Sequence, residues 1–316
     1  MNATWECIVV GAGAAGLSAG LVLGRARRRT LVVDAGGQSN RVSDGIGGLL
    51  GNDTRPPADF YAAGAAELAA YPSVELRLGE VVRGERDGDG FVLELADGAR
   101  ETASRVLLAT GMDYRHPALP GIEGRWGRSV FHCPFCHGWE HRGEPLAVLD
   151  RGASGVHRAL LLRGWSDDVT LLTDGDPELG PDEVDLLHAA GVTVDERPVA
   201  GLHGPGDGLA SVAFADGGER PCGGLLVPVT LHQRSGLAAQ LGAEISEPGP
   251  LAADGVAVDP AYATSVPGLF AAGDAGGVLP SVANAVASGN TAAAMLVGSL
   301  MTAPRELVAR PTATTP

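Results

Sequence analysis

Residues Glu6–Gly16 read ECIVVGAGAAG, and this stretch decides the fold. Glu6–Val10 is a short apolar run with the length of a buried strand, and a glycine-rich turn follows it directly. Gly11 permits a tight turn, Gly13 lets the backbone approach a pyrophosphate, and Gly16 allows a helix to pack closely on the strand. The pattern predicts a strand, a phosphate-binding turn and a helix.

The residues after this turn complete a βαβ unit. An Ala- and Leu-rich segment predicts a helix to about Gly24, and a second apolar run, Thr30–Val33, ends in Asp34. A carboxylate at this place can accept a hydrogen bond from a ribose hydroxyl, and the helix N-terminus offers free N–H groups to phosphate. A glycine-rich turn with only a structural purpose would not explain Asp34. We therefore interpret the unit as a nucleotide site.

A second unit with the same order of elements follows further along the chain. Its strand is Leu146–Leu149, its turn is Asp150–Gly155, and a helix is expected before the strand Val169–Thr173. Two such units predict an α/β protein with two Rossmann-like, three-layer nucleotide-binding domains.

The second unit interrupts the first domain, because an apolar run near the C-terminus ends in Gly273-Asp274 and resembles another strand of the first sheet. We place the first domain at residues 1–116 and 234–316. The inserted domain, which also carries a CxxC pair, is placed at residues 117–233.

The segments between and after the two units predict further elements. Val74–Leu78 and Phe91–Leu95 alternate with Asp-Gly turns, which indicates a small antiparallel meander. Arg105–Ala109 predicts another strand. An Ala-rich helix is expected from about Val282, and the tail after Pro304 is expected to be disordered.

Composition restricts the possible functions. The formal net charge is −15, and the 23 basic residues include no lysine. An acidic chain without a basic block binds nucleic acid or an anionic membrane poorly, and a Walker or Schiff-base lysine is excluded. No segment has the length and hydrophobicity of a membrane span, and no signal peptide is visible. We expect a cytoplasmic protein whose four cysteines do not form a structural disulfide framework.

Two of the cysteines stand in the motif Cys133–Glu140, which reads CPFCHGWE. A CxxC pair can close a small disulfide ring, and a helix N-terminus or a neighbouring His⁺ lowers its thiolate pKa. We favour a redox dithiol, and three alternatives remain. Zinc would need about four ligands, and His132, His137 and His141 are nearby without a second CxxC. CxxCH also matches c-type haem attachment, and the pair could be purely structural.

The other two cysteines are not expected to react. Cys7 lies inside the first apolar strand and is predicted to be part of the core, because free cysteine is among the most buried residue types. Cys222 lies in a loop rich in glycine and proline.

Taken together, these motifs resemble the low-molecular-weight thioredoxin reductases, which are FAD-dependent pyridine nucleotide-disulfide oxidoreductases. Gly11–Gly16, Thr110-Gly111, Cys133–Cys136 and Thr264–Asp274 occur in the order found in that family, over nearly the whole chain. The proline between the cysteines and the HGWE after them are more similar to the thioredoxin-reductase-like dithiol oxidases. Those enzymes close disulfides in natural products such as gliotoxin and holomycin.

The resemblance implies FAD in the first domain and a homodimer. It implies that Cys136 lies nearest the flavin as the charge-transfer thiolate, that Cys133 exchanges with the substrate, and that His137 is an acid/base. The residues it implies for FAD binding are Gly11, Gly13, Ala14, Ala15, Gly16, Asp34, Ala35, Gly36, Gln38, Asn52, Val82, Thr110, Gly111, Gly273 and Asp274.

The second glycine motif departs from the family pattern. Its first glycine position holds Asp150, and a carboxylate there repels a pyrophosphate. After the next strand the family has an Arg-rich segment for the 2′-phosphate of NADPH, whereas this chain has Asp174 and Asp176. NADPH is therefore not expected to bind well. Asp174 leaves NADH open, because it can bond a free 2′-hydroxyl.

These features favour an FAD-dependent oxidase that converts a small dithiol to a disulfide and passes the electrons to O₂. A thioredoxin-reductase-like enzyme with NAD(P)H or an unusual electron donor is one alternative, with a thioredoxin-like protein as its partner. A non-catalytic flavin redox sensor is another. The sequence does not name the substrate.

Overall fold

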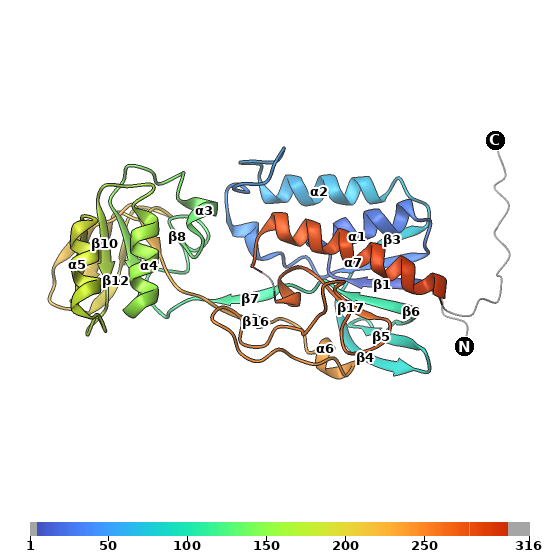
Figure 1. Cartoon of the computed structure of the whole chain (residues 1–316). Coiled ribbons are helices and arrows are strands. Elements are labelled where there is room, and N and C mark those ends of the chain that lie inside the picture. The colour runs from blue at the N-terminus through green and yellow to red at the C-terminus, as the bar shows by residue number, and fades with distance from the viewer. Residues whose placement is uncertain (1–4, 278, 303–316) are drawn as a thin grey trace.

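The computed structural model describes residues 5–277 and 279–302, so the tail expected after Pro304 lies outside the described residues. Two lobes, each built on its own sheet, are joined by a narrow waist (Figure 1). The first lobe has a seven-stranded sheet, and the second has a five-stranded and a three-stranded sheet. We call them the first and second lobes.

The sheet of the first lobe has the order β3-β2-β1-β6-β5-β4, with β17 also paired to β6. Its strands are β1 (Trp5–Val10), β2 (Thr30–Asp34), β3 (Val74–Leu78), β4 (Val81–Asp87), β5 (Gly90–Leu95), β6 (Arg100–Leu108) and β17 (Leu269–Ala271). β1, β2, β3, β6 and β17 run parallel, whereas β4 and β5 are antiparallel. One edge of β6 pairs with β1, and its other edge is shared by β5 and β17.

Helices cover one face of this sheet. They are α1 (Ala14–Arg25), α2 (Pro57–Leu68) and α7 (Val282–Thr302), and they share one apolar core with the sheet (Figure 1). The short helix α6 (Leu237–Gln240) and the strands β4 and β5 share the core on the other face. Cys7 is fully buried, as predicted, and burial raises the pKa of its thiol.

The position predicted for β3 was wrong. Val74–Leu78 was expected in an antiparallel meander, but it pairs parallel with β2 at the edge of the main sheet. The reason is α2, which the sequence analysis did not find and which makes β2-α2-β3 a crossover connection. Pro57 at its start and Asp59 in its first turn are typical of a helix N-terminus. The antiparallel strands are β4, β5 and the first half of β6.

The second lobe also has three layers. Its parallel sheet has the order β11-β10-β9-β15-β8, and its antiparallel sheet has the order β12-β13-β14. The strands are β8 (Val130–Phe131), β9 (Leu146–Leu149), β10 (Val169–Leu172), β11 (Val192–Asp195), β12 (Val199–His203), β13 (Ser211–Phe214), β14 (Glu219–Pro221) and β15 (Gly224–Leu226). α4 (Gly152–Leu162) and α5 (Pro181–Ala189) share the core on one face, and the antiparallel strands share the core on the other. The predicted α/β fold with two Rossmann-like units is confirmed.

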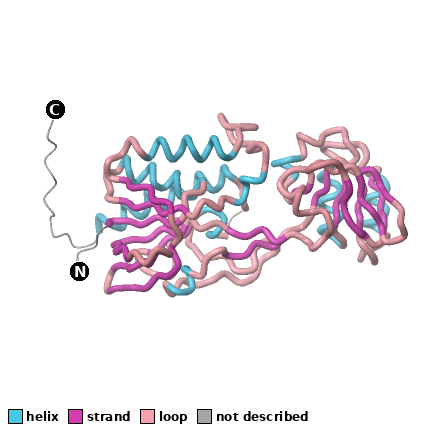
Figure 2. The backbone as a smooth tube through the Cα atoms, turned by 180° about the vertical axis from the view of Figure 1, so that it is seen from behind, coloured by secondary structure: helices cyan, strands magenta, loops and turns pink. Residues whose placement is uncertain are grey.

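Two antiparallel strands carry the chain across the waist. β7 (Met112–Arg115) leads out of the first lobe and β16 (Thr230–Gln233) leads back, with Tyr114 opposite Leu231. Figure 2 shows this pair from behind, between the two lobes. We propose that the domain boundaries lie here, at residues 116/117 and 233/234. Within the described residues, no helix is long and apolar enough to cross a membrane.

Candidate functional site

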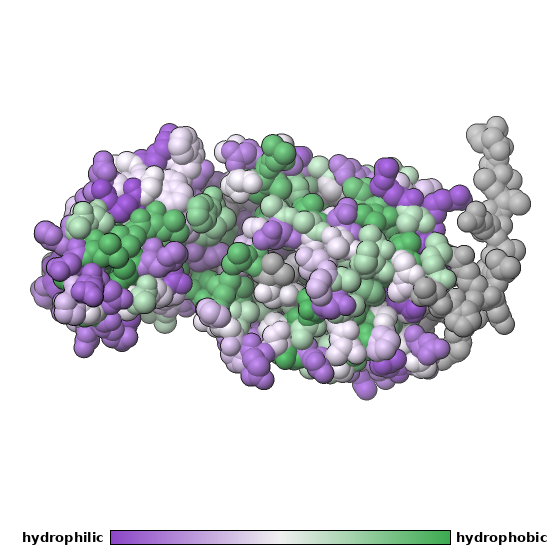
Figure 3. Space-filling model, viewed as in Figure 1, coloured by the Kyte–Doolittle hydropathy of each residue, from purple (hydrophilic) through white to green (hydrophobic). Residues whose placement is uncertain are grey.

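A cavity of about 790 Å³ is lined by residues of both lobes. The first lobe contributes the turn after β1, the loop after β2 and the N-terminus of α7, and the second lobe contributes the segment with the CxxC pair. Apolar residues gather on the surface at the waist, where the lobes meet (Figure 3). The two motifs singled out in the sequence therefore open onto one space.

The first glycine motif lies along this cavity. Gly11, Gly13, Ala14 and Ala15 are among its lining residues. Gly11 has a φ of 102°, which favours glycine, and a Cβ there would overlap the Ala109 carbonyl. Gly13 is the N-cap of α1, and Ala14 and Ala15 are the first two residues of this helix.

Gly16 lies behind the cavity wall. A Cβ at this position would overlap the carbonyl of Gly11, so glycine is required for the close packing of α1 on the preceding turn. This packing is the one expected for Gly16 from the sequence.

Asp34 and its neighbours form a second part of the wall. Asp34, Ala35 and Gln38 line the cavity, whereas Gly36 does not. The Asp34 carboxylate accepts hydrogen bonds from the backbone N–H of Ala12 at 3.3 Å, the N–H of Gly36 at 3.1 Å and the Gln38 amide at 3.2 Å. These donors fix a carboxylate at the end of β2, where a ribose hydroxyl could bind it.

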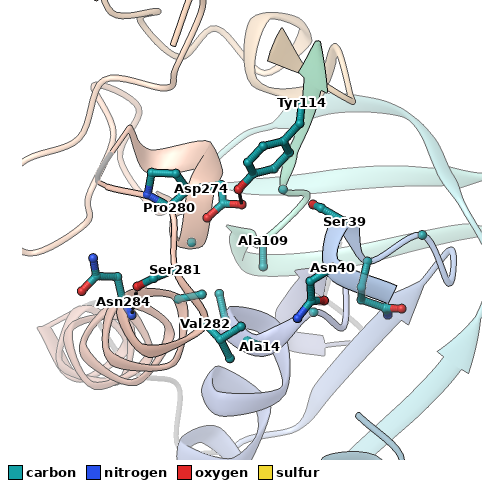
Figure 4. Close-up of a pocket in the computed structure, with 18 of the residues that line it drawn as sticks. Ala14, Ser39, Asn40, Ala109, Tyr114, Asp274, Pro280, Ser281, Val282 and Asn284 are labelled. Carbon is teal, nitrogen blue, oxygen red and sulfur yellow. Dashed lines mark hydrogen bonds between the residues drawn. The ribbon is translucent and has the colours of Figure 1, made fainter. Parts of the chain in front are cut away.

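A third part of the wall lies at the ends of β6 and β17, where Thr110, Gly111, Gly273 and Asp274 line the cavity. Tyr114 also lines it, and its hydroxyl donates a hydrogen bond of 2.7 Å to Oδ2 of Asp274 (Figure 4). Burial raises the pKa of Asp274, and burial together with this carboxylate raises the pKa of Tyr114. Tyr114 was not predicted from the sequence, because no local pattern indicates a partner 160 residues away.

Two further polar residues of the wall were missed. Arg234 lines the cavity, forms an ion pair with Asp113 at 2.8 Å and donates to the carbonyl of Gly37. Tyr61 donates a hydrogen bond of 2.7 Å to Asn40, and burial raises its pKa to about 12.

Besides Gly16 and Gly36, two more predicted cofactor residues do not line the cavity. Asn52 accepts a hydrogen bond of 2.9 Å from Arg55 and is not a lining residue. The side chain of Val82 is partly exposed, and its neighbour Val81 lines the cavity instead.

The CxxC pair forms a disulfide at the second-lobe side of the cavity. Cys133 and Cys136 are bonded, with their Cα atoms 5.4 Å apart, and both line the cavity. Cys133 is the N-cap of the short helix α3 (Pro134–His137), whose first residue is the proline of the motif. Proline suits this position, because its missing N–H would have no partner in the helix.

His137 follows the disulfide and lies against both lobes. Its Nε2 is 3.0 Å from the carbonyl oxygen of Gly127 and 3.4 Å from Oγ of Ser43, a residue of the first lobe. Because a carbonyl only accepts, Nε2 carries the proton in the neutral ring and Nδ1 keeps its lone pair. Nδ1 is buried and has no hydrogen-bond partner. Burial lowers the pKa of His137, so the neutral ring is favoured.

The two other histidines near the motif have different surroundings. Burial lowers the pKa of His132 to about 4, and its ring lies 4.9 Å from that of Tyr114. Nδ1 of His141 is 3.0 Å from Glu144. Within residues 5–277 and 279–302, no three His, Cys, Asp or Glu side chains are grouped as metal ligands.

In the second glycine motif, the side chain of Asp150 takes the place expected for a phosphate. Asp150 accepts hydrogen bonds from the Arg151 N–H at 2.8 Å and the Ser154 hydroxyl at 2.6 Å, and it forms an ion pair with Arg158. The carboxylate thus occupies the N-terminal end of α4, where a phosphate binds in nucleotide sites. Further along, Asp174 accepts a hydrogen bond of 2.7 Å from the backbone N–H of Val199.

With this geometry established, the comparisons with known proteins decide the family. The pyridine nucleotide-disulphide oxidoreductase family matches residues 5–289. The chain belongs to this family. Thioredoxin reductase tcpT of Claviceps purpurea is similar, with 32% identity over 309 residues that cover 94% of each chain.

Two solved structures are similar over nearly the whole chain. An oxidoreductase from Agrobacterium tumefaciens is 34% identical, with a TM-score of 0.89 over 95% of this chain and 99% of that chain. The structure of HlmI is 37% identical, with a TM-score of 0.85 over 94% of this chain and 92% of that chain. Family membership makes this protein a thioredoxin-reductase-like oxidoreductase enzyme and implies a flavin cofactor.

Proposed function

We propose that this enzyme oxidises a small dithiol to a disulfide, with FAD as its flavin and O₂ as the final electron acceptor. The observation that carries the proposal is the shared cavity. The Cys133–Cys136 disulfide and the glycine turn at Gly11 and Gly13 line the same space of about 790 Å³. A dithiol and a nucleotide-bearing cofactor could therefore exchange electrons there.

The residues present suit FAD. The turn at Gly13 offers backbone N–H groups to a pyrophosphate, and the Asp34 carboxylate is held by its neighbours where it can accept from a ribose. We assign the ribityl and flavin side of the cofactor to the wall around Tyr114 and Asp274. When bound, the flavin supplies a two-electron acceptor for the dithiol and passes the pair to O₂, giving H₂O₂.

The chain's own cysteines would oxidise the substrate by thiol–disulfide exchange. A substrate thiolate attacks Sγ of Cys133, and Cys136 leaves as a thiolate. The second substrate thiol then attacks the substrate sulfur of this mixed disulfide and releases Cys133. The substrate loses two electrons and becomes a disulfide, and the enzyme pair gains both electrons as a dithiol.

We assign the proton transfers to His137. Its Nδ1 is buried, carries the lone pair and has no hydrogen-bond partner. Because burial keeps the ring neutral near pH 7, His137 can take up a proton released during the exchange. The Gly127 carbonyl holds the other ring nitrogen in place at 3.0 Å.

We further propose that the dithiol, and not NADPH, reduces the enzyme. The carboxylate of Asp150 already uses the donors of Arg151, Ser154 and Arg158 that a pyrophosphate would need. Its negative charge would repel that pyrophosphate, and Asp174 and Asp176 offer no cation to a 2′-phosphate. The CPFCHGWE motif resembles that of the dithiol oxidases, which also supports electron flow from a dithiol substrate to the flavin.

A reductase that acts on a thioredoxin-like protein is the second candidate, and the name of the similar tcpT protein favours it. A flavin sensor is less favoured, because it leaves the intact disulfide in the cavity unexplained. We also propose a homodimer, from the family resemblance alone, and a cytoplasmic location, from the lack of a visible signal peptide and membrane span in the sequence.

Turnover under air separates these candidates. Purified FAD-loaded protein is mixed with a small dithiol such as dithiothreitol, and H₂O₂ is followed. The oxidase gives catalytic H₂O₂ with the dithiol alone. Turnover that requires both NAD(P)H and thioredoxin would favour the reductase, and no turnover with either would favour the sensor.

A further inference from the structure

Gly47 marks a very close approach of the first lobe to the redox disulfide. A Cβ at this position would lie 2.5 Å from the carbonyl oxygen of Cys136 and 3.0 Å from its Cα atom. Gly47 is not among the glycines with positive φ, so its backbone would accept alanine. The close contact with Cys136 is therefore the reason why a side chain does not fit here.

A second glycine occurs at the same seam on the opposite side. A Cβ at Gly127, in the second lobe, would lie 2.5 Å from Cγ2 of Val42 in the first lobe. Each lobe thus has a glycine at a point where the other lobe approaches closely. We call residues 42–48 the seam loop, because this segment of the first lobe supplies the contacts with Gly127 and Cys136.

Polar contacts join the seam loop to the same part of the second lobe. Oγ of Ser43 is 3.4 Å from Nε2 of His137, and Asp44 forms an ion pair of 3.1 Å with Arg128. The ion pair is largely exposed, and exposed ion pairs contribute little to stability. The closest approaches of the two lobes along the seam loop are at Gly47 and Gly127.

We infer that the seam loop positions the Cys133–Cys136 disulfide against the flavin cavity, and that Gly47 sets the distance. The inference rests on the proposed function only in requiring that this dithiol delivers electrons to a flavin. Gly47 is a positioning residue: it acts through Cys136, the cysteine that we assign to the flavin side.

A larger residue at position 47 should separate two steps that occur together in the native enzyme. Exchange between a substrate dithiol and the disulfide uses Cys133, Cys136 and His137, which all lie in the second lobe, and Gly47 contacts only backbone atoms of Cys136. Transfer of the electron pair from the resulting dithiol to the flavin depends on the separation of the lobes. A displacement of about 1 Å at a reacting group can cost on the order of 100-fold in rate.

The experiment compares native FAD-loaded protein with Gly47→Ala and with the control Gly124→Ala. Gly124 lies in the second lobe, and a Cβ there would meet nothing within 4 Å. Each protein is mixed anaerobically with dithiothreitol, and flavin absorbance, the long-wavelength thiolate–flavin band and alkylation of the cysteines are followed. For Gly47→Ala we expect normal FAD content, cysteines reduced at the native rate, a lost band and flavin reduction slower by roughly 10- to 100-fold. Gly124→Ala should match the native protein.

Native band intensity and native flavin reduction in Gly47→Ala would overturn the inference. If Gly47→Ala does not retain FAD, Val42→Leu, which adds bulk opposite Gly127 from the seam loop without replacing a glycine of positive φ, must give the same separation of steps. If dithiothreitol reduces the cysteines and the flavin of this second variant together, as in the native protein, the inference is wrong. A native protein whose flavin is never reduced by dithiols would contradict the proposed function instead, so the two failures are distinguishable.

Discussion

Replacing Asp150 should improve the use of NADPH. The Asp150 side chain is 13% exposed and lies at the N-terminal end of α4, so water screens its charge only weakly. At about 4 Å and an effective dielectric constant of about 20, one pair of like charges costs roughly 4 kcal/mol. The ion pair with Arg158 offsets part of this repulsion. We expect a net gain of about 1.4–2.8 kcal/mol, which corresponds to roughly 10- to 100-fold in affinity.

Two variants separate charge from space. Asp150→Asn keeps the shape of the side chain without its charge, and Asp150→Gly removes both. Rates of flavin reduction are measured anaerobically against NADPH and NADH concentration, with Asp97→Asn as the control, because Asp97 lies in an exposed turn of the first lobe and accepts a local hydrogen bond from the N–H of Ala99. Both variants should use NADPH better than the native enzyme, and Asp150→Gly should gain more. Unchanged reduction in both variants would refute the argument that this carboxylate blocks the site.

Two further predictions concern the dithiol and its base. Cys133→Ser should keep the long-wavelength thiolate band and Cys136→Ser should abolish it, with dithiol turnover lost in both; a band that follows Cys133 would reverse the assignment. Burial lowers the pKa of His137, so the acid limb of the pH–rate profile should lie below the usual histidine value of about 6.5. His137→Asn should reduce turnover by about 100- to 10,000-fold and remove that limb, and a limb that persists would assign it to another group.

The elements that the sequence predicted are those with a strong local signal. The strand before Gly11 and the helix that begins at Val282 occur where expected. Both were predictable because an apolar run and a glycine-rich turn are patterns of residues that are neighbours in the sequence. The fold class followed from two such units. The meander was misplaced because the residues of a short strand such as β3 do not show whether it pairs parallel or antiparallel with its neighbour, and β3 pairs parallel with β2.

The site was predictable in its motifs but not in its contacts. The cysteine pair and the residues around Gly13 and Asp34 reach one cavity as the motifs suggested. The partners Tyr114 and Asp274 are separated by 160 residues, and only the folded chain brings them together. The close contacts of Gly47 with Cys136 and of Gly127 with Val42 were not predictable for the same reason, because only the folded chain brings these residues together.

The most direct test of the proposed electron flow is an anaerobic titration of the bound flavin with a small dithiol, NADPH and NADH in parallel. The dithiol should give the long-wavelength spectrum at about one equivalent per site and bleach the flavin fully at about two, because the disulfide and the flavin each take two electrons, and admission of air should restore the oxidised spectrum with release of H₂O₂. NADPH should bleach it slowly or not at all. Rapid bleaching by micromolar NADPH together with no response to dithiols would contradict the proposal.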